Sequence, residues 1–550
     1  MEPRENSPYR NVARKTAAIA GLAAITIPFG ITQNPPAPVP RPSLCSGNVN
    51  VLSLLPSPAG SPPNPHEDGD VQYLNALIDN TESALLGEVS SASSLGQAQQ
   101  VHLLGKLFIY DKSISPAKNI ACATCHAPYA GFTGGTNIFN ATTVAQPGGT
   151  AITNAVPPEP NIRFGPRKPQ SYAYAAFSPI LHFNATQGDF YGGNFWDMRA
   201  TGNRLANPAA EQAQGPPVNP VEIGNPDPAC VVWKVSQGGY RSLVESVWGI
   251  QSFAIKWPSN VASVCATPGP APASNPYPVQ LSAVDRGTAN STYDHLTLSV
   301  ASYESSTEVS GFSSKFDAWL AGNANLTAAE QRGYELFNGK AHCNQCHLSG
   351  NAINSTNLAP ADVAPLFTDF TSANIGLPRN LALPYYCESK PDQYGYTANP
   401  MGFGFYDLGV GAMLSSTTND PDIQQWKYLA PLFNGKFQVP TLRNVDMRPR
   451  ADFTKAYMHN GYLKSLKEVV HFYNTSQSLP RCAPGSPGEK VSCWPAPETP
   501  QNVTTLIGSL GLTGDEEDDI VDFLRTLTDN FVTTGTPASA LERKKPTSNQ

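Results

Sequence analysis

Charged residues are scarce in this chain. They make up 14% of its 550 residues, against about 25% in an average soluble domain. The net charge of −7 provides no excess of basic side chains for nucleic acid and favours basic protein partners. The sequence also lacks a long segment of alternating polar and apolar residues, so it does not predict a large sheet. Because proline is abundant, at 52 residues, we expect a mainly α-helical protein with long irregular loops.

Long hydrophobic runs are also missing, and the longest candidate lies near the start. Arg4, Arg10, Arg14 and Lys15 precede an apolar stretch over residues 16–31. Basic residues followed by a stretch shorter than a membrane span are typical of an export signal. No clean small-x-small cleavage site follows, so an uncleaved anchor is the alternative. We therefore predict residues 1–31 to be a signal peptide or anchor, and the protein to be exported.

Two Cys-x-x-Cys-His pentapeptides carry the strongest chemical signal. They are Cys122-Ala-Thr-Cys125-His126 and Cys343-Asn-Gln-Cys346-His347. In each, two thiols can attach one porphyrin and the following imidazole can ligate its iron. A zinc site would need a second ligand pair close in space, and a redox dithiol does not need the adjacent histidine. The sequence thus predicts two covalently bound c-type haems.

Six further cysteines lie outside the haem motifs. An even number of cysteines in an exported protein indicates disulfides. Cys482 with Cys493 and Cys230 with Cys265 are close in sequence and are the pairs we expect, although sequence does not fix the connectivity. The six residues are Cys45, Cys230, Cys265, Cys387, Cys482 and Cys493.

Each haem motif follows a predicted helix, which makes a loose internal repeat. The first helix is expected over residues 95–110, with an apolar face. The second begins at Thr327, where Glu330 three residues later completes a capping-box pattern. Thr513 and Glu516 form the same pattern before a third helix, which would help to close a haem-binding core.

The predicted units are a Pro/Ser-rich linker, two cytochrome c-like haem domains and a polar tail. Proline-rich stretches within the domains are expected to be surface insertions. The predicted ranges are 32–75 for the linker, 76–300 and 301–532 for the N-terminal and C-terminal haem domains, and 533–550 for the tail, with the proline-rich stretches at 143–170, 257–285 and 476–503.

Several segments over residues 95–530 match, in order, a known family. They are Leu104-Gly105-Lys106-Leu107-Phe108 and Gly131-Phe132-Thr133 around the first motif; Phe195-Trp196-Asp197-Met198-Arg199-Ala200, Gln212, Gly215-Pro216 and Asn219-Pro220-Val221-Glu222; and Val439-Pro440-Thr441-Leu442-Arg443-Asn444-Val445, Ala456-Tyr457-Met458-His459-Asn460-Gly461 and Val469-Val470-His471-Phe472-Tyr473-Asn474. With the two haem motifs, these segments resemble the bacterial di-haem cytochrome c peroxidase family, and in particular its MauG-like branch.

The resemblance implies that the first haem is the peroxide site. His126 would be its proximal ligand and Glu222 the distal acid/base that moves a proton between the peroxide oxygens. Gln212 and Pro216 would line the distal pocket. Many relatives block this haem with a second histidine, but the sequence has none between His126 and His182. We therefore expect an iron that is open to peroxide in the oxidised protein.

The second haem would be held by His347 and a C-terminal axial ligand. Tyr473 stands at the position that carries methionine in the ordinary peroxidases, as in the MauG-like branch, and Met458 is the rival ligand. A phenolate favours ferric and higher states, whereas a thioether raises the reduction potential. The resemblance also implies that Trp196 is an electron relay between the haems, although a large aromatic filling the interface would look the same.

Other matched positions concern haem neighbours and calcium. Arg443 and His459 are expected near a haem, either for its propionates or for structural hydrogen bonds.

The family also tends to hold calcium with an asparagine side chain and carbonyls, and Thr454 matches one carbonyl donor. Arg167, in the loop 165–169, puts a cation where we would place that asparagine. A fixed guanidinium could replace the divalent ion, which argues against calcium.

The leading hypothesis is therefore a periplasmic di-haem peroxidase that reduces hydrogen peroxide to water. A small redox protein, a cytochrome c or a cupredoxin, would supply electrons through the second haem and Trp196, and relatives often form homodimers. One alternative is a MauG-like enzyme whose two irons share a high-valent state and oxidise a protein or organic substrate. The other is an electron-transfer cytochrome with two six-coordinate haems and no catalytic activity, against which the missing distal histidine and Glu222 argue.

Overall fold

The computed structural model describes residues 67–135, 142–145, 162–350, 364–416 and 421–532. These residues belong to one compact unit, Pro42–Gln550. The predicted export signal, linker and polar tail lie outside them, apart from residues 67–75. The boundary predicted between residues 300 and 301 stays a prediction. None of the helices in the described part of the chain is long and apolar enough to cross a membrane.

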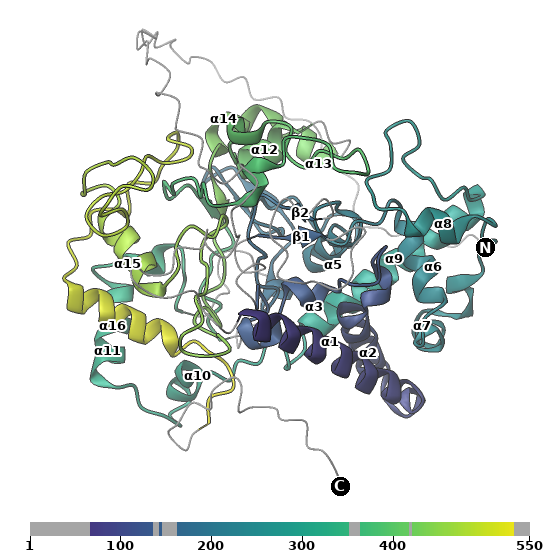
Figure 1. Cartoon of the computed structure of the whole chain (residues 1–550). Helices are drawn as coiled ribbons and strands as arrows, with labels where there is room; N and C mark the ends of the chain where they lie inside the picture. The colour runs from purple at the N-terminus through teal and green to yellow at the C-terminus, as the bar shows by residue number, and fades with distance from the viewer. Residues whose placement is uncertain (1–66, 136–141, 146–161, 351–363, 417–420, 533–550) are drawn as a thin grey trace, which may run out of the picture. The chain divides into compact units, whose positions relative to one another are not determined.

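The described residues are mainly α-helical, as expected (Figure 1). The strands among them form three two-stranded antiparallel sheets, which pair β1 with β2, β3 with β4 and β5 with β6. The strands are β1 (Val144–Ala145), β2 (Arg163–Phe164), β3 (His182–Asn184), β4 (Asp189–Tyr191), β5 (Ser372–Ala373) and β6 (Phe437–Gln438). The helices are α1 (Glu67–Val89), α2 (Gln97–Tyr110), α3 (Cys122–Cys125), α5 (Pro208–Ala213), α6 (Pro228–Ser236), α7 (Arg241–Trp248), α8 (Val261–Ala266), α9 (Ala283–Glu304), α10 (Lys315–Leu320), α11 (Ala328–Asn338), α12 (Val410–Ser415), α13 (Pro421–Gln424), α14 (Ala430–Phe433), α15 (Leu466–Thr475) and α16 (Gly514–Arg525).

The first haem motif, on α3, follows α2, and α2 packs against the long helix α9. The helix predicted over residues 95–110 is confirmed as α2. Its buried face includes Leu104, Leu107 and Phe108, at the spacing that places side chains on one side of a helix. The partner helix α9 is capped by Ser282, the residue before it, whose hydroxyl accepts a hydrogen bond from the Asp285 amide at 3.1 Å.

The second haem motif follows α11, which lies beside α16 (Figure 1). Both predicted capping boxes are confirmed. The Thr327 hydroxyl accepts from the Glu330 amide at 3.2 Å, and the Thr327 amide donates to the Glu330 carboxylate at 2.7 Å. Thr513 and Glu516 make the same reciprocal pair at the start of α16. Each box satisfies two amides that a helix start leaves without an intrahelical partner.

The proline-rich stretch over residues 476–503 differs from its prediction. It carries Trp494, which is 0% exposed and packs against Phe472 with ring centroids 5.0 Å apart. The indole nitrogen of Trp494 donates to the Thr475 hydroxyl at 3.0 Å. The prediction of a surface insertion was wrong here, because a buried tryptophan with a satisfied indole anchors the stretch in the second core.

Hydrogen bonds join the N-terminal and C-terminal halves of the described chain. The Gln438 amide donates to the Trp196 carbonyl at 2.8 Å, and the Gly192 amide donates to the Phe370 carbonyl at 2.9 Å. The ammonium of Lys455 reaches the carbonyl of Ala130 at 3.0 Å. The two halves are therefore held together by direct hydrogen bonds.

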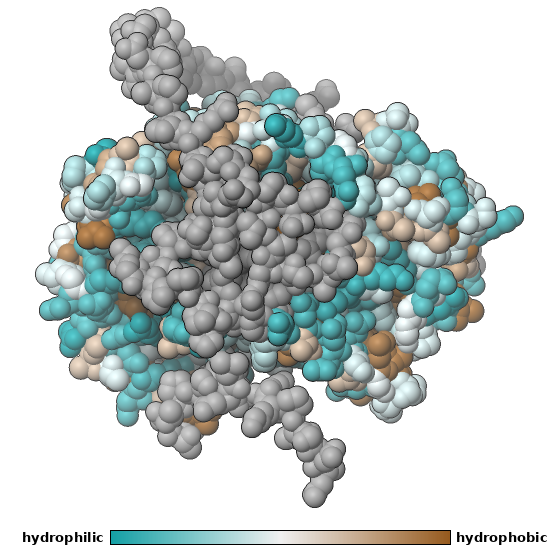
Figure 2. All heavy atoms as spheres, viewed as in Figure 1, coloured by the Kyte–Doolittle hydropathy of each residue, from teal (hydrophilic) through white to brown (hydrophobic). Residues whose placement is uncertain are grey.

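Figure 2 shows a surface on which hydrophobic residues form small separate patches between hydrophilic ones. The exposed large hydrophobic side chains are spread along the chain, and Ile250, Val284 and Val491 are among the most exposed. Isolated exposed apolar residues are normal on a soluble protein and do not by themselves mark an interface.

Candidate active site

A cavity of about 310 Å³ lies beside the first haem motif. His126, Gln212 and Glu222 are among its lining residues, together with Trp196. Three segments that are distant in the sequence therefore meet at one cavity: the end of α3, the region of α5, and the turn that carries Glu222. The structure brings together most of the residues predicted for the peroxide site.

His126 is oriented for metal binding by the loop that follows it. Its Nδ1 lies 3.1 Å from the carbonyl oxygen of Phe132. A carbonyl can only accept, so Nδ1 carries the proton and Nε2 is left as the ligand atom. Burial lowers the pKa of His126 to about 4, which keeps the imidazole neutral, as an iron ligand must be.

Glu222 carries a buried carboxylate oxygen with no hydrogen-bond partner among the described residues. Burial raises the pKa of this carboxyl, whereas the positive charge of Arg199 and the side chain of Asn219 act in the opposite direction. A buried oxygen without a hydrogen bond lowers the stability of the folded protein unless a molecule in the cavity donates a hydrogen bond to it. This carboxyl is therefore suited to exchanging a proton with a small polar molecule in the cavity.

One prediction about the rest of this cavity differs from what the structure contains. Pro216 is not among its lining residues and instead begins the short 3₁₀ helix η7 (Pro216–Val218), which leads to Glu222. Two further residues, Phe195 and Arg199, line the cavity although no role was predicted for them. The Arg199 guanidinium lies 3.6 Å from the Phe195 ring centroid. Their place in the matched Phe-Trp-Asp-Met-Arg-Ala segment was the signal that could have identified them.

His182, the next histidine after the first motif, lies outside this cavity. It is exposed on β3, and its ring stacks on Tyr191 with centroids 5.7 Å apart. His126 is the one histidine among the described residues that line the cavity. The arrangement agrees with the expectation that no second histidine blocks the first haem.

A second cavity, of about 680 Å³, surrounds the second haem motif. Cys343, Cys346 and His347 line it. Nδ1 of His347 lies 2.9 Å from the Phe367 carbonyl oxygen, and burial lowers the pKa of His347 to about 4. The geometry repeats that of His126: a backbone carbonyl fixes the tautomer and leaves Nε2 free for a metal. Both sites thus fit a covalently attached haem.

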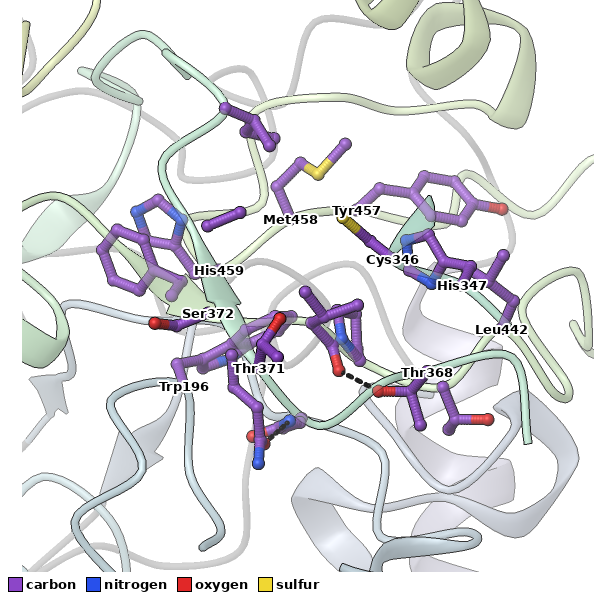
Figure 3. Close-up of a pocket in the computed structure, with 18 of the residues that line it drawn as sticks. Trp196, Cys346, His347, Thr368, Thr371, Ser372, Leu442, Tyr457, Met458 and His459 are labelled. Carbon is purple, nitrogen blue, oxygen red and sulfur yellow. Dashed lines mark hydrogen bonds between the residues drawn. The ribbon is translucent and has the colours of Figure 1, made fainter. Parts of the chain in front are cut away.

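Tyr473 and Met458 line the same second cavity, so both candidate axial ligands are near the second motif. Tyr473 comes from α15, and burial raises the pKa of its phenol. Met458 lies in a loop with φ +70°, a left-handed conformation that side-chain-bearing residues rarely adopt. In Figure 3, Met458 lies near Cys346 and His347.

Trp196 lines both cavities. Its indole nitrogen donates to the Lys168 carbonyl at 3.0 Å, which holds the ring in place. The amide of Lys168 in turn donates to the carbonyl of His459 at 2.7 Å. In Figure 3, Trp196 and His459 lie on one side of the second cavity and His347 on the other. Trp196 is therefore a wall that the two haem sites share.

Arg443 and His459 both line the second cavity, with different partners. The Arg443 guanidinium is fully buried and donates two hydrogen bonds to the Asp317 carboxylate, each at 2.8 Å. A third hydrogen bond goes to the Pro365 carbonyl at 2.7 Å. These three bonds fit the second of the two roles expected for Arg443, structural hydrogen bonding rather than propionate binding. The His459 ring stacks on Phe437 at 3.5 Å, and its Nε2 has no hydrogen-bond partner among the described residues.

Arg167 occupies the loop that the family would use for calcium. Its guanidinium forms ion pairs with Asp197 at 2.7 Å and Asp407 at 2.6 Å. The two carboxylates raise the pKa of Arg167 against the opposing effect of burial, so the cation is fixed. Across the described part of the chain, no three His, Cys, Asp or Glu side chains form a metal-binding group.

Both expected disulfides are present, Cys230–Cys265 and Cys482–Cys493. Cys387 is also disulfide-bonded, and Cys45 lies outside the described residues. The four cysteines of the two haem motifs take part in no disulfide, as attachment to porphyrin requires.

Known proteins resemble this chain at the level of family, sequence and fold. A family model described as di-haem cytochrome c peroxidase matches residues 99–325. The methylamine utilization protein MauG from Paracoccus denitrificans (strain Pd 1222) is 28% identical over 432 residues, which are 78% of this chain and 88% of that protein. Cytochrome-c peroxidase IdrP1 from Denitromonas iodatirespirans is 32% identical over 217 residues, 38% of this chain and 44% of that protein.

Among solved structures, the diheme peroxidase BthA from Burkholderia thailandensis E264 has a similar fold. Its TM-score is 0.54 at 23% identity, covering 80% of this chain and 88% of BthA. Residues 99–325 thus match the di-haem cytochrome c peroxidase family, and with the two cavities beside paired Cys-x-x-Cys-His motifs these likenesses support an oxidoreductase that carries two c-type haems.

Proposed function

We propose that this protein is a periplasmic peroxidase that reduces hydrogen peroxide to water at the first haem. One observation carries the proposal: His126 and Glu222 line a single cavity whose wall, Trp196, also lines the cavity of the second haem. A metal ligand, a proton-transfer group and an oxidisable aromatic ring are the parts that peroxide reduction at a haem needs.

Glu222 is the proposed acid/base. When bound, the haem iron supplies the site where peroxide coordinates and the capacity for one-electron steps. Glu222 would take a proton from one peroxide oxygen and return it to the other, which leaves as water as the O–O bond breaks. Conversion of the remaining oxygen to the second water would use two electrons from the external donor and two protons from solvent. Gln212, on the same cavity wall, would orient the peroxide by hydrogen bonding.

Trp196 is the proposed electron relay. Its half-buried ring lies between the two cavities, and the hydrogen bond to the Lys168 carbonyl fixes its orientation. An indole can pass electrons either by transient oxidation or as a bridge. Electrons would enter from an external donor at the second haem and cross Trp196 to the first.

The donor is proposed to be a small redox protein, a cytochrome c or a cupredoxin. The net charge of −7 favours a basic partner, since opposite charges speed encounter. Two disulfides agree with an oxidising compartment, and the basic and apolar N-terminal stretch agrees with export. Assembly into a homodimer belongs to the same proposal.

A MauG-like reaction is the second candidate. It is favoured by Tyr473, which lines the second cavity with His347. A tyrosinate ligand stabilises ferric and higher oxidation states. The second haem would then hold oxidising equivalents that are used on a protein or organic substrate rather than accept electrons from a dedicated cytochrome.

The deciding experiment mixes the oxidised holoprotein with peroxide in a stopped-flow spectrophotometer. We expect rapid spectral change at the first haem in the wild type. Glu222→Gln should keep the haem content and slow that change by about 10²- to 10⁴-fold, the usual contribution of an acid/base group. Glu88→Gln, at an exposed position of α1, is the matched control and should react normally.

Unchanged peroxide kinetics in Glu222→Gln would remove this residue from the mechanism. Ferric protein whose two haems are both low-spin and do not bind cyanide would instead support simple electron transfer. Rapid spectral change without turnover of a redox-protein donor would favour the MauG-like candidate.

A further inference from the structure

The loop that follows the first haem motif, residues 127–133, decides how the proximal histidine is oriented. Its Phe132 carbonyl accepts a hydrogen bond from Nδ1 of His126 at 3.1 Å. The Ala127 amide donates to the Thr133 carbonyl at 2.9 Å, which joins the two ends of the loop. Because the loop moves as one closed turn, its position determines how well the Phe132 carbonyl meets the imidazole.

Lys455 reaches this loop from the C-terminal half of the chain. It is 5% exposed, and its ammonium donates to three backbone carbonyls, those of Ala130 at 3.0 Å, Asn444 at 3.3 Å and Met447 at 2.8 Å. An ammonium has three N–H donors, one more than a neutral amine. The three carbonyls therefore match the charged form and satisfy all of its donors. We call this set of contacts the lysine clasp.

The loop approaches the lysine clasp at a glycine. Gly131 has φ +74°, a left-handed conformation that glycine adopts without strain. A Cβ at this position would lie 2.9 Å from the Asn444 carbonyl oxygen and 3.3 Å from Nζ of Lys455. The absence of a side chain on Gly131 therefore lets the loop lie directly on the clasp.

The C-terminal side of the lysine clasp is anchored to the second haem unit. The Asn444 side chain donates to the Asp529 carboxylate at 2.9 Å and accepts from the Asp529 amide at 2.8 Å. The Asn444 amide donates to the Leu527 carbonyl at 3.0 Å. Leu527 and Asp529 come just after α16, the helix that packs against α11. Asn444 and Lys455 also line the second cavity, so the clasp joins the first haem loop to the wall of the second haem site.

The loop has a further support within its own half. The Ser171 hydroxyl donates to the Gly131 carbonyl at 2.7 Å. Loss of the Lys455 ammonium should therefore shift the loop rather than unfold it. What Lys455 adds is a direct connection between the surroundings of His126 and the second haem unit.

We propose that Lys455 is a positioning residue for the first haem. Its ammonium holds the loop 127–133 against the second haem unit and thereby sets the hydrogen bond between His126 and Phe132. The inference rests on the proposed function, in which His126 is the proximal ligand of the peroxide site. A firm hydrogen bond from Nδ1 makes an imidazole a more basic metal ligand. The C-terminal half then acts on the first haem through its ligand as well as through Trp196.

The test uses the reduced holoprotein, because resonance Raman spectroscopy detects the iron–histidine stretching band of a five-coordinate ferrous haem. The measurements are made at pH 6, below the pKa of about 7 to which burial lowers Lys455. Lys455→Met keeps most of the side-chain volume and removes the N–H donors. We expect its band to move to lower frequency, since a weaker hydrogen bond leaves His126 a weaker ligand, and its peroxide reaction to slow about tenfold.

Chemical rescue separates the role of the ammonium from packing. Lys455→Ala leaves space for propylammonium, which supplies three N–H donors, whereas tetramethylammonium carries the charge without donors. We expect propylammonium to return the band toward its wild-type position and tetramethylammonium to leave it shifted. Lys464→Ala is the matched control, because the Lys464 ammonium donates to the Gly461 carbonyl of its own segment at 2.6 Å. Its band should equal that of the wild type.

Gly131→Ala disturbs the same contact from the loop and keeps Lys455, so it guards against a folding defect in the lysine variants. It should also lower the band frequency. A wild-type band in both Lys455→Met and Gly131→Ala, with a normal peroxide reaction, would overturn the positioning role alone. A shift in Lys455→Ala that propylammonium does not reverse would overturn it too, by assigning the effect to packing. A wild-type protein without an iron–histidine band or a spectral response to peroxide would overturn both this inference and the proposed function.

Discussion

Gly333 of α11 lies directly against Asp519 of α16: a Cβ added to Gly333 would be 1.9 Å from the Asp519 carbonyl oxygen. The first haem unit repeats this relationship, because a Cβ on Gly105 of α2 would be 1.9 Å from the Ser299 carbonyl oxygen of α9. In both units, the helix before the haem motif crosses its partner at a glycine. The loose repeat expected from the sequence is thus present in how the helices pack.

Replacing either crossing glycine should destabilise its haem unit. Gly333→Ala forces the two helix backbones apart, and overpacking of this kind costs about 1–3 kcal/mol. This exceeds the gain of about 1 kcal/mol that alanine brings to a helix interior. Thermal unfolding followed at the haem absorption bands should show a lower Tm.

Gly287→Ala is the matched control, because this exposed glycine of α9 has nothing within 4 Å of an added Cβ. It should raise the Tm slightly, by the helix-propensity gain alone. Equal effects of Gly287→Ala and Gly333→Ala on the Tm would show that the close crossing does not limit stability.

Tyr473→Phe should change the absorption and electron paramagnetic resonance spectra of the second haem. The reason is that phenylalanine offers no oxygen to the iron at the cavity that Tyr473 shares with His347. Met458→Leu keeps the volume at the rival position and should leave both spectra as they are. The reverse result, with Met458→Leu altering the spectra, would assign the ligand to methionine.

Trp196→Phe should slow electron transfer between the haems by about tenfold or more, because phenylalanine is much harder to oxidise than indole. The measurement is the rate at which the first haem is re-reduced after peroxide treatment when electrons are supplied to the second. Trp233→Phe, in the small cluster around the Cys230–Cys265 disulfide, should not alter that rate. A normal rate in Trp196→Phe would leave this residue with a packing role only.

Glu388 should make stability depend on pH. Its carboxylate accepts the Phe164 amide at 3.0 Å, and burial raises its pKa from 4.5 to about 8. The folded state therefore holds a proton that the unfolded state releases, so the stability that Glu388 contributes is lost as pH rises from about 4.5 to about 8. Glu388→Gln removes this dependence and should gain Tm relative to the wild type across that window. A Tm difference that stays constant from pH 4 to 9 would contradict it.

The haem sites were predictable because their signals are local. Five consecutive residues define each motif, and the capping boxes at Thr327 and Thr513 depend on side chains three residues apart.

The helix α9 was missed because its signal is not local. Its buried face mixes Thr292, Leu296 and Ser299, and this mixture of polar and apolar residues has no clear apolar stripe. Such a face becomes a core only because α2, α5 and α6 pack against it.

The distal cavity was predictable in part. Glu222 and Gln212 lie at its wall as the matched segments implied, whereas Arg199 reaches it through a stack on Phe195 that no spacing rule encodes. Pro216 was misplaced because a motif fixes the order of residues but not which of them turns inward. Ring stacks and turns that bring distant segments together depend on tertiary packing, which sequence periodicity does not report.

Because Trp196 forms a wall of both cavities, the two haem sites cannot be separated at the connection between α9 and α10. The Gln438 amide that bonds the Trp196 carbonyl and the His459 carbonyl that accepts from Lys168 belong to the other half of the chain. Cutting the chain there would remove one partner from each of these bonds and open the wall that both cavities share. We therefore expect neither half alone to keep its haem cavity closed.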